Sequence, residues 1–475
     1  MMRQTASVAS RAPGIPSRSL PALRNVDDKL CEAVAALNRK DVNYWEFRDA
    51  TGRVEAHSYY QYPAMMVPSM QRVLLQTVLR LQPGIRQLVD PFAGSGTLIV
   101  EGISEGLNVT AYDINPLAVL LCRAKSELFD TDVLRKGSTD LLTTLAADTD
   151  CTHEASFANK LKWFSESAII ELSRLRRGIR GLTDPPTRRF YWVALAETVR
   201  LSSNSRTSTY KLHVRKPEQI ERLASPQLTF DRVVQRNLDA HEEFCSSLRT
   251  RERLSLPRRY VGNLTVQLHD SRLADPRQHD VLISSPPYGD NTTTVPYGQN
   301  AYLPLQWIDL DDIEEDLSTS DCLRTAYEID RRSLGGCRRR GSLTKVYATV
   351  MARSTTLRST FQALSSQPRD RPARVLSFVN DLNTTLAAAA ASIRPNGYLI
   401  WTLGNRRVGN QEIPLHRILK ELLLGHDCSF VASIERPIPT KRMASRNGIS
   451  DTIKHERVLI FRKNPPTSVQ DASTS

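Results

Sequence analysis

The sequence lacks several features that would assign it quickly to a class of protein. None of its apolar runs approaches the roughly 20 residues that a membrane-spanning helix needs, so we expect no membrane partner. The seven cysteines are scattered, and no CxxC spacing occurs. This pattern indicates neither a disulfide framework nor a zinc site. We therefore expect a protein of the reducing cytoplasm that binds no metal.

Charge of one sign is in excess. The chain of 475 residues carries 64 Lys and Arg against 51 Asp and Glu, a formal net charge of +13. Such an excess favours a polyanionic partner, although a well-solvated surface explains it equally well. The hydrophobic share of 40% and the charged share of 24% are ordinary for a globular protein. The length is sufficient for a large core and more than one domain.

Strand and helix patterns alternate over much of the chain. Residues 85–107 and 108–128 each combine an apolar strand, a turn and a helix, and strand patterns return at 263–270, 279–288 and 396–405. This alternation predicts an α/β protein with a parallel sheet and helices on both faces. The segments "FVASIERPI" (430–438) and "HERVLIFRK" (455–463) predict an antiparallel hairpin.

Two regions interrupt the alternation. Residues 129–260 have mainly helical periodicity, with arginines gathered in "RLRRGIRG" and "TRRF". Residues from about 309 to 345 carry "DLDDIEEDL" and then "CRRRGSLTK", opposite charge blocks that predict a solvated excursion.

A glycine turn, "DPFAGSGT" (90–97), lies between a strand and a helix. Glycines let the backbone approach a ligand closely, and the helix start offers free N–H groups. The third glycine of a dinucleotide site and the Gly-Lys-Ser/Thr of a P-loop are both missing. Asp113 ends the next strand, where it could accept from ribose hydroxyls or simply cap a helix. Asp270 ends a third strand, where it could accept from an adenine amino group.

The strand "VLIS" ends on "SPPY" (285–288). Two prolines remove backbone donors and fix the chain direction, so they end a strand rigidly. Taken alone, this is a rigid strand-ending turn. Together with the glycine turn and the two acids, it suggests a nucleoside cofactor at the carboxyl ends of parallel strands, beside a reactive turn.

The pair of motifs resembles the S-adenosylmethionine-dependent amino-methyltransferases that methylate exocyclic amines of DNA bases. "YPAMMVPSMQRVL" (62–74) is similar to the segment that precedes the glycine turn in that family. The resemblance covers about 60–125 and 260–465, and residues 396–419 resemble the strand and loop that follow the catalytic turn. It implies S-adenosyl-L-methionine as cofactor and a Rossmann-like class I methyltransferase sheet with an inserted, mainly helical region.

The resemblance also assigns roles to residues. An exocyclic amine is a poor nucleophile, because its lone pair is delocalised into the ring, so acceptors must draw on its protons and hold it in line. Ser285 Oγ and the Pro286 carbonyl can accept, and Tyr288 offers a face for a base taken out of the duplex. The expected catalytic residues are Ser285, Pro286, Pro287 and Tyr288. The expected cofactor residues are Tyr62, Pro63, Asp90, Pro91, Phe92, Ala93, Gly94, Ser95, Gly96, Thr97, Asp113, Asn115 and Asp270.

Three polar segments are candidates for contact with DNA. In "RPIPTKRMASRN" (436–447), Lys441, Arg442, Arg446 and Asn447 could reach phosphates or base edges, or form a solvated hairpin loop. Residues 200–216 have the composition of a backbone-binding surface or of a solvated linker. Residues 289–307 could wall the base pocket or form a polar surface loop.

The expected organisation is a disordered basic tail (1–28), the cofactor-binding half of a methyltransferase domain (29–128), a helical insertion that could recognise the target (129–260), the catalytic half (261–465) and a second disordered tail (466–475). The family places its recognition region either between the cofactor and catalytic halves or outside both. Here about 130 residues separate the helix after Asp113 from the strand of Asp270, an order that fits no standard class of the family.

In that family the serine of "SPPY" favours transfer to the N4 amine of cytosine. We expect a site-specific methyltransferase that acts on double-stranded DNA in a restriction-modification or defence system; a cognate restriction endonuclease is a candidate partner, and its existence stays open. N6 methylation of adenine is the nearest alternative. An RNA guanine-N2 methyltransferase and a degenerate methyltransferase acting as a DNA-binding regulator are more distant ones. The recognition sequence and the oligomeric state stay open.

Overall fold

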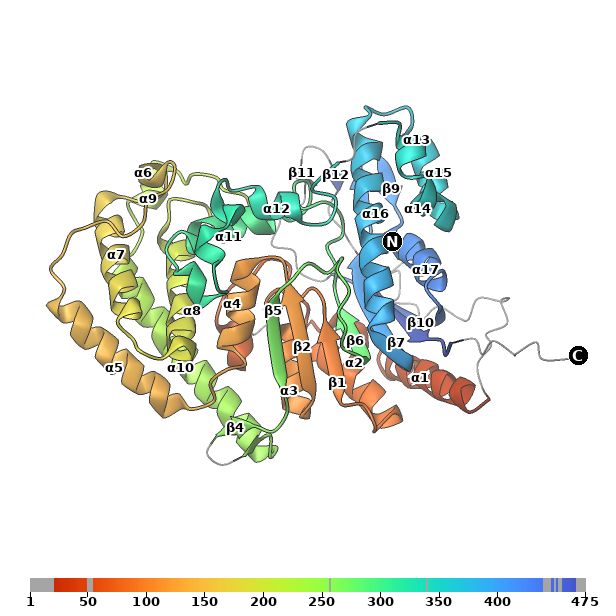
Figure 1. Ribbon diagram of the computed structural model, residues 1–475, viewed down its shortest axis with the longest axis horizontal. Coiled ribbons are helices and arrows are strands. Elements are labelled where there is room, and N and C mark those ends of the chain that lie inside the picture. Colours follow the sequence, from red (N-terminus) through yellow and green to blue (C-terminus); the bar gives the residue numbers. More distant parts are fainter. Residues whose placement is uncertain are drawn as a thin grey trace, which may run out of the picture.

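Seven strands form the central sheet of the computed structural model, which describes residues 21–48, 54–255, 258–338, 341–438, 446–447, 450–451 and 455–466. Figure 1 shows the sheet in the middle of the molecule, with the strand order β10-β13-β7-β6-β1-β2-β5. Its strands are β1 (Gln87–Asp90), β2 (Asn108–Asp113), β5 (Leu264–Leu268), β6 (His279–Ser284), β7 (Ile393–Gly404), β10 (Cys428–Pro437) and β13 (His455–Lys463). The mixed α/β class is confirmed, and the sheet agrees with a Rossmann-like methyltransferase.

Most pairings in the sheet are parallel. β5, β2, β1, β6 and β7 run in one direction, and β13 lies antiparallel to both of its neighbours. The predicted antiparallel pairing of 430–438 with 455–463 is confirmed, since Cys428 to Pro437 pair with Lys463 to His455. Because the parallel strands end at one edge, the segments that follow them meet there.

Alternate residues of each strand enter two different cores. Leu88 and Ile283 belong to one hydrophobic cluster, and Val89 and Leu282 to the other. This is the period-2 pattern of a strand covered on both faces. The first core takes side chains from helices α1 (Pro21–Lys40), α2 (Pro68–Leu81), α3 (Thr97–Glu105) and α4 (Pro116–Ala124). The second takes them from α14 (Ala348–Arg353), α15 (Thr355–Leu364), α16 (Asp370–Ala391) and α17 (Leu415–Leu424).

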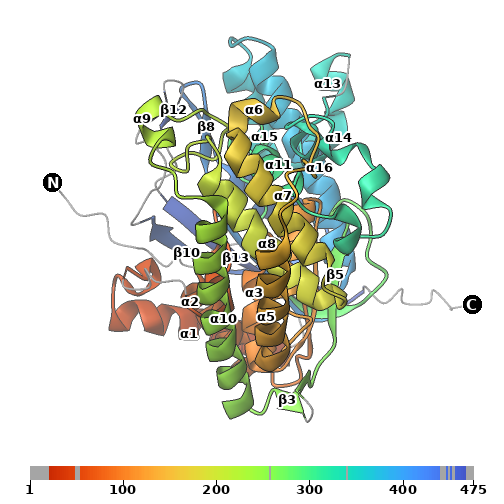
Figure 2. The ribbon, with the colours of Figure 1, turned by 90° about the vertical axis from the view of Figure 1, so that its left-hand side faces the viewer.

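Helices α5 to α10 pack beside the sheet, next to α4. Figures 1 and 2 show α5, α7, α8 and α10 lying side by side, and α8 is buried along most of its length. Their starts are well defined, because Ser165, Asp184 and Ser225 accept backbone N–H groups at the starts of α7, α8 and α10. The bounds are α5 (Thr131–Ala147), α6 (Lys160–Trp163), α7 (Glu166–Arg180), α8 (Pro185–Ser202), α9 (Pro217–Ile220) and α10 (Pro226–Thr250).

Short elements complete the described chain. Two of them matter for the site, α11 (Tyr297–Leu305) and α12 (Glu328–Arg332). The others are α13 (Leu343–Val346), the two-stranded pairs β3 (Leu254–Ser255) with β4 (Arg259–Tyr260), β8 (Arg406–Val408) with β9 (Gln411–Ile413) and β11 (Arg446–Asn447) with β12 (Ser450–Asp451), and the 3-10 turns η1 (Tyr44–Glu46), η2 (Glu55–Ser58), η3 (Leu310–Asp312), η4 (Leu317–Thr319) and η5 (Asp321–Leu323).

The helices and cysteines bear on whether the chain spans a membrane or forms disulfides. In the part of the chain that the structure describes, every helix is too short or too polar to span a bilayer. All seven cysteines lie in that part, and none forms a disulfide.

Candidate active site

A hollow of about 810 Å³, open to solvent, lies at the carboxyl end of the parallel strands; we call it the sheet-end hollow. Thirteen of the seventeen residues assigned from the sequence to the cofactor or to catalysis line it: Tyr62, Pro63, Pro91, Phe92, Ala93, Gly94, Ser95, Thr97, Asp113, Asn115, Asp270, Ser285 and Pro287. The chain therefore brings the glycine turn and the proline turn to the same cavity.

The glycine turn needs its glycines for different reasons. Gly94 has φ +50°, and a β-carbon there would lie 3.3 Å from Tyr62 Cε1. Gly96 has φ +75° and is the N-cap residue of α3; a β-carbon there would meet Cys122 Sγ at 3.2 Å. Gly94 therefore keeps the floor of the hollow open, whereas Gly96 allows the helix to pack behind it.

Asp113 closes β2 and faces the glycine turn. One of its carboxylate oxygens accepts from Gly94 N at 2.9 Å, and the other accepts from Asn115 N at 2.8 Å. Burial raises the pKa of Asp113 to about 6, although those backbone hydrogen bonds act in the opposite direction. The N-cap of α4 is Asn115, whose side chain accepts from Leu117 N, so Asp113 is not the helix cap.

Tyr62 forms the wall opposite Asp113. Its hydroxyl oxygen accepts from Asn115 Nδ2 at 3.1 Å, and its ring stacks on Tyr297 with centroids 5.7 Å apart. Tyr297 lies at the start of α11 and also lines the hollow. The sequence placed Tyr297 only within the polar stretch 289–307 and did not single it out, because only the fold brings it against Tyr62.

Asp270 lies at the end of β5 beside an arginine. Arg272 Nη2 donates to Asp270 Oδ2 at 2.6 Å. Burial alone would raise the pKa of Asp270, but the hydrogen bonds and charge of Arg272 outweigh it, so the pKa is lowered. The preceding His269 also lines the hollow, and its Nε2 is buried without a partner among the described residues. A ligand donor or acceptor could satisfy that nitrogen.

Four assigned residues do not line the hollow: Asp90, Gly96, Pro286 and Tyr288. Asp90 lies beneath it, where it accepts from Ser284 Oγ at 2.6 Å and from Phe92 N at 3.1 Å. Burial raises the pKa of Asp90 to about 7, against these two hydrogen bonds. Because Asp90 ends β1 and Ser284 ends β6, this contact ties the glycine turn to the proline turn.

Tyr288 is held by a chain of polar contacts. Its hydroxyl donates to Glu456 Oε1 at 3.1 Å and lies 3.4 Å from Ser285 Oγ. Glu456 Oε2 in turn accepts from Arg436 Nε at 3.0 Å, and Arg436 is almost fully buried. Burial and the carboxylate of Glu456 raise the pKa of Tyr288 well above its usual value. The tyrosine ring is thus fixed from β13 and β10, which lie far along the chain.

The residues after Tyr288 are held by an arginine. Arg406 Nη1 lies 3.0 Å from Asp290 Oδ2, and Arg406 Nη2 donates to Thr293 Oγ1 at 3.0 Å. Both members of the ion pair are nearly buried, and a β-carbon at Gly289 would collide with the guanidinium. Of the polar stretch 289–307, Asn291 and Tyr297 line the hollow, whereas Thr292 and Thr293 are exposed. Some residues of the stretch therefore form part of a pocket wall, and others lie in a polar surface loop.

The predicted solvated excursion at about 309–345 is wrong in part. Ile329, Arg332, Ser333 and Leu334, in and just after α12, line the hollow, and Figure 1 shows α12 beyond the ends of β2 and β5. Asp330 is fully buried and accepts from Gly298 N at 2.9 Å, so it holds the start of α11. The acidic and basic runs of this segment predicted exposure to solvent, because the sequence does not show that their partners lie in distant segments of the chain.

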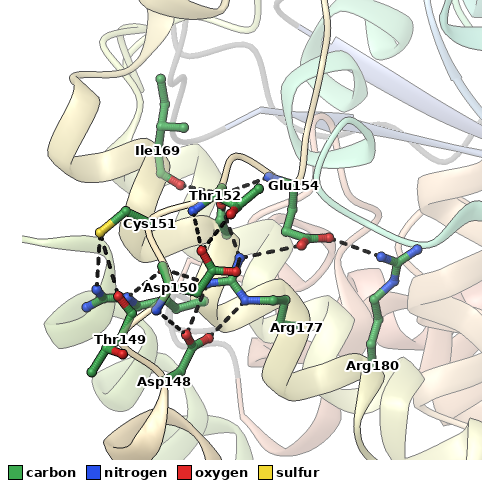
Figure 3. A network of polar contacts seen from close by, with 11 residues as sticks. Asp148, Thr149, Asp150, Cys151, Thr152, Glu154, Ile169, Arg177 and Arg180 are labelled. Atoms are coloured by element: carbon green, nitrogen blue, oxygen red, sulfur yellow. Dashed lines mark hydrogen bonds and ion pairs between the residues drawn. The ribbon is translucent and has the colours of Figure 1, made fainter.

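Arginines of α7 and α8 also have acidic partners in other segments of the chain. Arg177 pairs with Asp148 at 3.0 Å, and Arg180 pairs with Glu154 at 3.1 Å in the network of Figure 3. Arg180 also reaches Asp309 at 2.6 Å. Arg188 pairs with Asp312 at 2.6 Å. Arg180 and Arg188 thus join α7 and α8 to the 309–312 segment, and Arg177 joins α7 to the 148–154 segment. These cations already have acidic partners, so they are not free for a polyanion.

The structure describes only part of the C-terminal segment that was predicted to contact DNA. Lys441 and Arg442 lie outside the described residues. Arg446 and Asn447 form β11, which pairs with β12. The position of their side chains is not part of the described structure, so their contact with DNA stays a prediction.

Comparison with known proteins gives two relatives and no matching family model. The chain is 29% identical over 456 residues to the Type II methyltransferase M.MvaI of Kocuria varians, which covers 92% of this chain and 96% of the relative. A shorter match of 86 residues, also 29% identical, covers 18% of this chain and 16% of the Type II methyltransferase M.MjaII of Methanocaldococcus jannaschii. The similarity to a methyltransferase extends over nearly the whole chain.

Proposed function

We propose that this protein is a site-specific DNA methyltransferase, which transfers the methyl group of S-adenosylmethionine to the N4 amine of cytosine in duplex DNA. The observation that carries the proposal is the meeting of the glycine turn, Asp113 and the proline turn in one hollow, tied together by Asp90 and Ser284. The similarity to proteins named Type II methyltransferases supports site-specific methylation of DNA. The choice of the cytosine N4 amine rests on the serine of "SPPY", and a role in restriction-modification with a cognate endonuclease is part of the proposal.

The residues present fit S-adenosylmethionine. The hollow is open to solvent and lined by both turns, and Gly94 leaves its floor without a β-carbon. Asp113 would accept from the ribose hydroxyls, because each carboxylate oxygen keeps capacity beyond its one backbone donor. His269 and Asp270 would face the adenine, and Tyr62 and Pro63 the methionine part. When bound, this cofactor supplies an electrophilic methyl group on a sulfonium.

The proline turn would hold the target amine. Ser285 Oγ and the Pro286 carbonyl would accept hydrogen bonds from the amine, which fixes its orientation and draws electron density toward nitrogen. The base must leave the duplex to reach this turn, and it would stack on an aromatic ring. Tyr288 is the ring assigned from the sequence. Its anchoring by Glu456 and Arg436 would keep it from rotating away.

Transfer of labelled methyl from S-adenosylmethionine tests the proposal. Purified protein is incubated with equal amounts of duplex DNA, single-stranded DNA or structured RNA, and the label in each is counted. We expect label in duplex DNA. Label in RNA alone would favour the guanine-N2 alternative. Specific binding of duplex DNA without any label would favour a regulator.

A further inference from the structure

A short basic hairpin stands beside the sheet-end hollow. We call residues 203–216 the basic hairpin, because Ser205 and Val214 form an antiparallel bridge within it. Arg206 N donates to the carbonyl of His213 at 2.8 Å, and Arg215 N donates to the carbonyl of Asn204 at 2.8 Å. The hairpin is therefore an ordered element that can present its side chains in fixed positions.

The hairpin differs in charge from the helices on either side of it. No acid occurs between Glu197 and Glu218, whereas Arg206, Lys211, Arg215 and Lys216 all lie in this stretch. Arg206, Lys211 and Lys216 are exposed and take part in none of the ion pairs found among the described residues. A cluster of exposed cations without acids repels itself, so an anionic partner would stabilise it.

The basic hairpin also lines a second cavity, which we call the hairpin hollow, of about 450 Å³. Its wall combines Arg200, Arg206 and Lys211 with hydroxyl groups of the hairpin, and its other side is α11. The hydroxyl-bearing residues are Ser203, Ser205, Thr207, Thr209 and Tyr210. Guanidinium, ammonium and hydroxyl donors together are the groups that bind phosphate oxygens of nucleic acids.

The two hollows adjoin. Gln61 lines the hairpin hollow and the next residue, Tyr62, lines the sheet-end hollow. Helix α11 contributes Tyr297 to the sheet-end hollow and Asn300 to the hairpin hollow. Leu212 N reaches Gln299 Oε1 on the same helix at 3.5 Å. A chain that enters the sheet-end hollow would thus pass close to the hairpin.

We propose that the hairpin hollow binds a phosphodiester of the DNA strand that carries the target base. The inference rests on the proposed function, since it names the phosphate contact next to the site where the base is held. Arg206 and Lys211 supply the charge, and the hydroxyls of Thr207 and Thr209 supply further donors. Such contacts fix the position of the strand and carry no sequence information.

The test is the salt dependence of DNA binding by the variant Arg206→Gln/Lys211→Gln. Affinity for a fluorescent duplex is measured by anisotropy between low and moderate salt in the absence of cofactor. We expect at least about a 10-fold weaker affinity at low salt. The slope of log affinity against log salt should become shallower by about 0.9, since one lost phosphate contact removes about that much.

A matched control removes the same two charges elsewhere. Arg135 and Lys136 are exposed on α5 and take part in none of the ion pairs among the described residues. Helix α5 runs along the lower left of Figure 1, away from α9, which follows the hairpin. The variant Arg135→Gln/Lys136→Gln should bind DNA nearly as wild type does. A charge-keeping variant, Arg206→Lys/Lys211→Arg, should recover most of the affinity and the slope, and all variants should share the thermal midpoint of the wild type.

The outcomes separate this inference from the proposed function. If wild type methylates duplex DNA but the hairpin variant keeps its affinity and slope, the hairpin assignment is overturned and the function stands. An equal loss in the α5 control would also overturn it, because the effect would then be one of net charge. If wild type binds and methylates RNA and not duplex DNA, both the function and this inference fail.

Discussion

The two sides of the sheet-end hollow are built in different ways. On the glycine-turn side, Asp113 is held by backbone N–H groups of Gly94 and Asn115, which lie within 20 residues of it. On the proline-turn side, Tyr288 is held by Glu456 and Asp290 by Arg406, both more than 100 residues away. The first side is fixed by local turn chemistry, whereas the second depends on the assembled sheet. We therefore expect mutations on the two sides to separate cofactor binding from base handling and from stability.

The largest expected effect is the loss of the buried cation on the proline-turn side. The variant Arg406→Met leaves the carboxylate of Asp290 nearly buried and without its ion pair. Breaking a buried pair from one side costs about 3–5 kcal/mol of unfolding free energy, measurable by chemical denaturation. The paired variant Arg406→Met/Asp290→Asn should recover part of that loss. Equal stability of Arg406→Met and wild type would contradict the role of this pair.

The next effect concerns Tyr288. We expect Tyr288→Ala to lower methyl transfer by about 100-fold or more, because a misplaced base costs that much, while the affinity for cofactor stays unchanged. Tyr288→Phe keeps the ring but loses the hydroxyl contact with Glu456, so its loss should be smaller. Single-turnover transfer and calorimetric titration of S-adenosylmethionine measure the two quantities. A drop in cofactor affinity in Tyr288→Ala would show that Tyr288 contributes to cofactor binding, against its assignment to the base.

On the glycine-turn side, Asp113→Ala should weaken cofactor binding. A hydrogen bond to a charged group contributes about 1.5–3 kcal/mol, which corresponds to roughly 10- to 150-fold in affinity. The affinity for duplex DNA without cofactor should not change. Asp113→Asn serves as the isosteric control; its single carbonyl oxygen can accept from only one of the two backbone N–H groups, and its thermal midpoint reports the cost of losing the other. Cofactor affinity equal to wild type would leave Asp113 with a purely structural role.

The smallest expected effect is a pH dependence of cofactor binding. The pKa of Asp113 is raised to about 6, so the carboxylate is largely ionised at pH 7 and becomes protonated as the pH falls through 6. The ionised form is the better acceptor for two hydroxyl groups. Cofactor affinity of wild type should therefore fall several-fold between pH 7 and 5. In Asp113→Asn the fall should disappear, and its persistence would assign the titration to another group.

The same comparison explains what could be predicted from the sequence. The strands, the glycine turn and the place of Asp113 could be predicted, because strand periodicity and turn residues are local signals. The pairing of β10 with β13 followed from two alternating segments around a polar loop. Ser285 and Pro287 were also predicted as site residues and line the hollow, although the chemical role assigned to them came from the family resemblance.

What could not be predicted depends on contacts between distant segments. Tyr297 is a site residue only because α11 places it on Tyr62, and α12 reaches the hollow although it follows an acidic stretch. Asp309 is acidic but pairs with Arg180, so its charge is compensated within the protein. A charge run shows its partners only after folding, because ion pairs of this kind link residues more than 100 positions apart.

The most direct test of the central claim is the identity of the modified base. A plasmid from cells that express the protein is digested to nucleosides, and the methylated product is identified by mass spectrometry against DNA from cells with Tyr288→Ala. The account predicts N4-methylcytosine in the first sample and its absence in the second. Detection of N6-methyladenine instead would mean that the sheet-end hollow methylates adenine. The absence of any methylated base that depends on the protein would contradict the account.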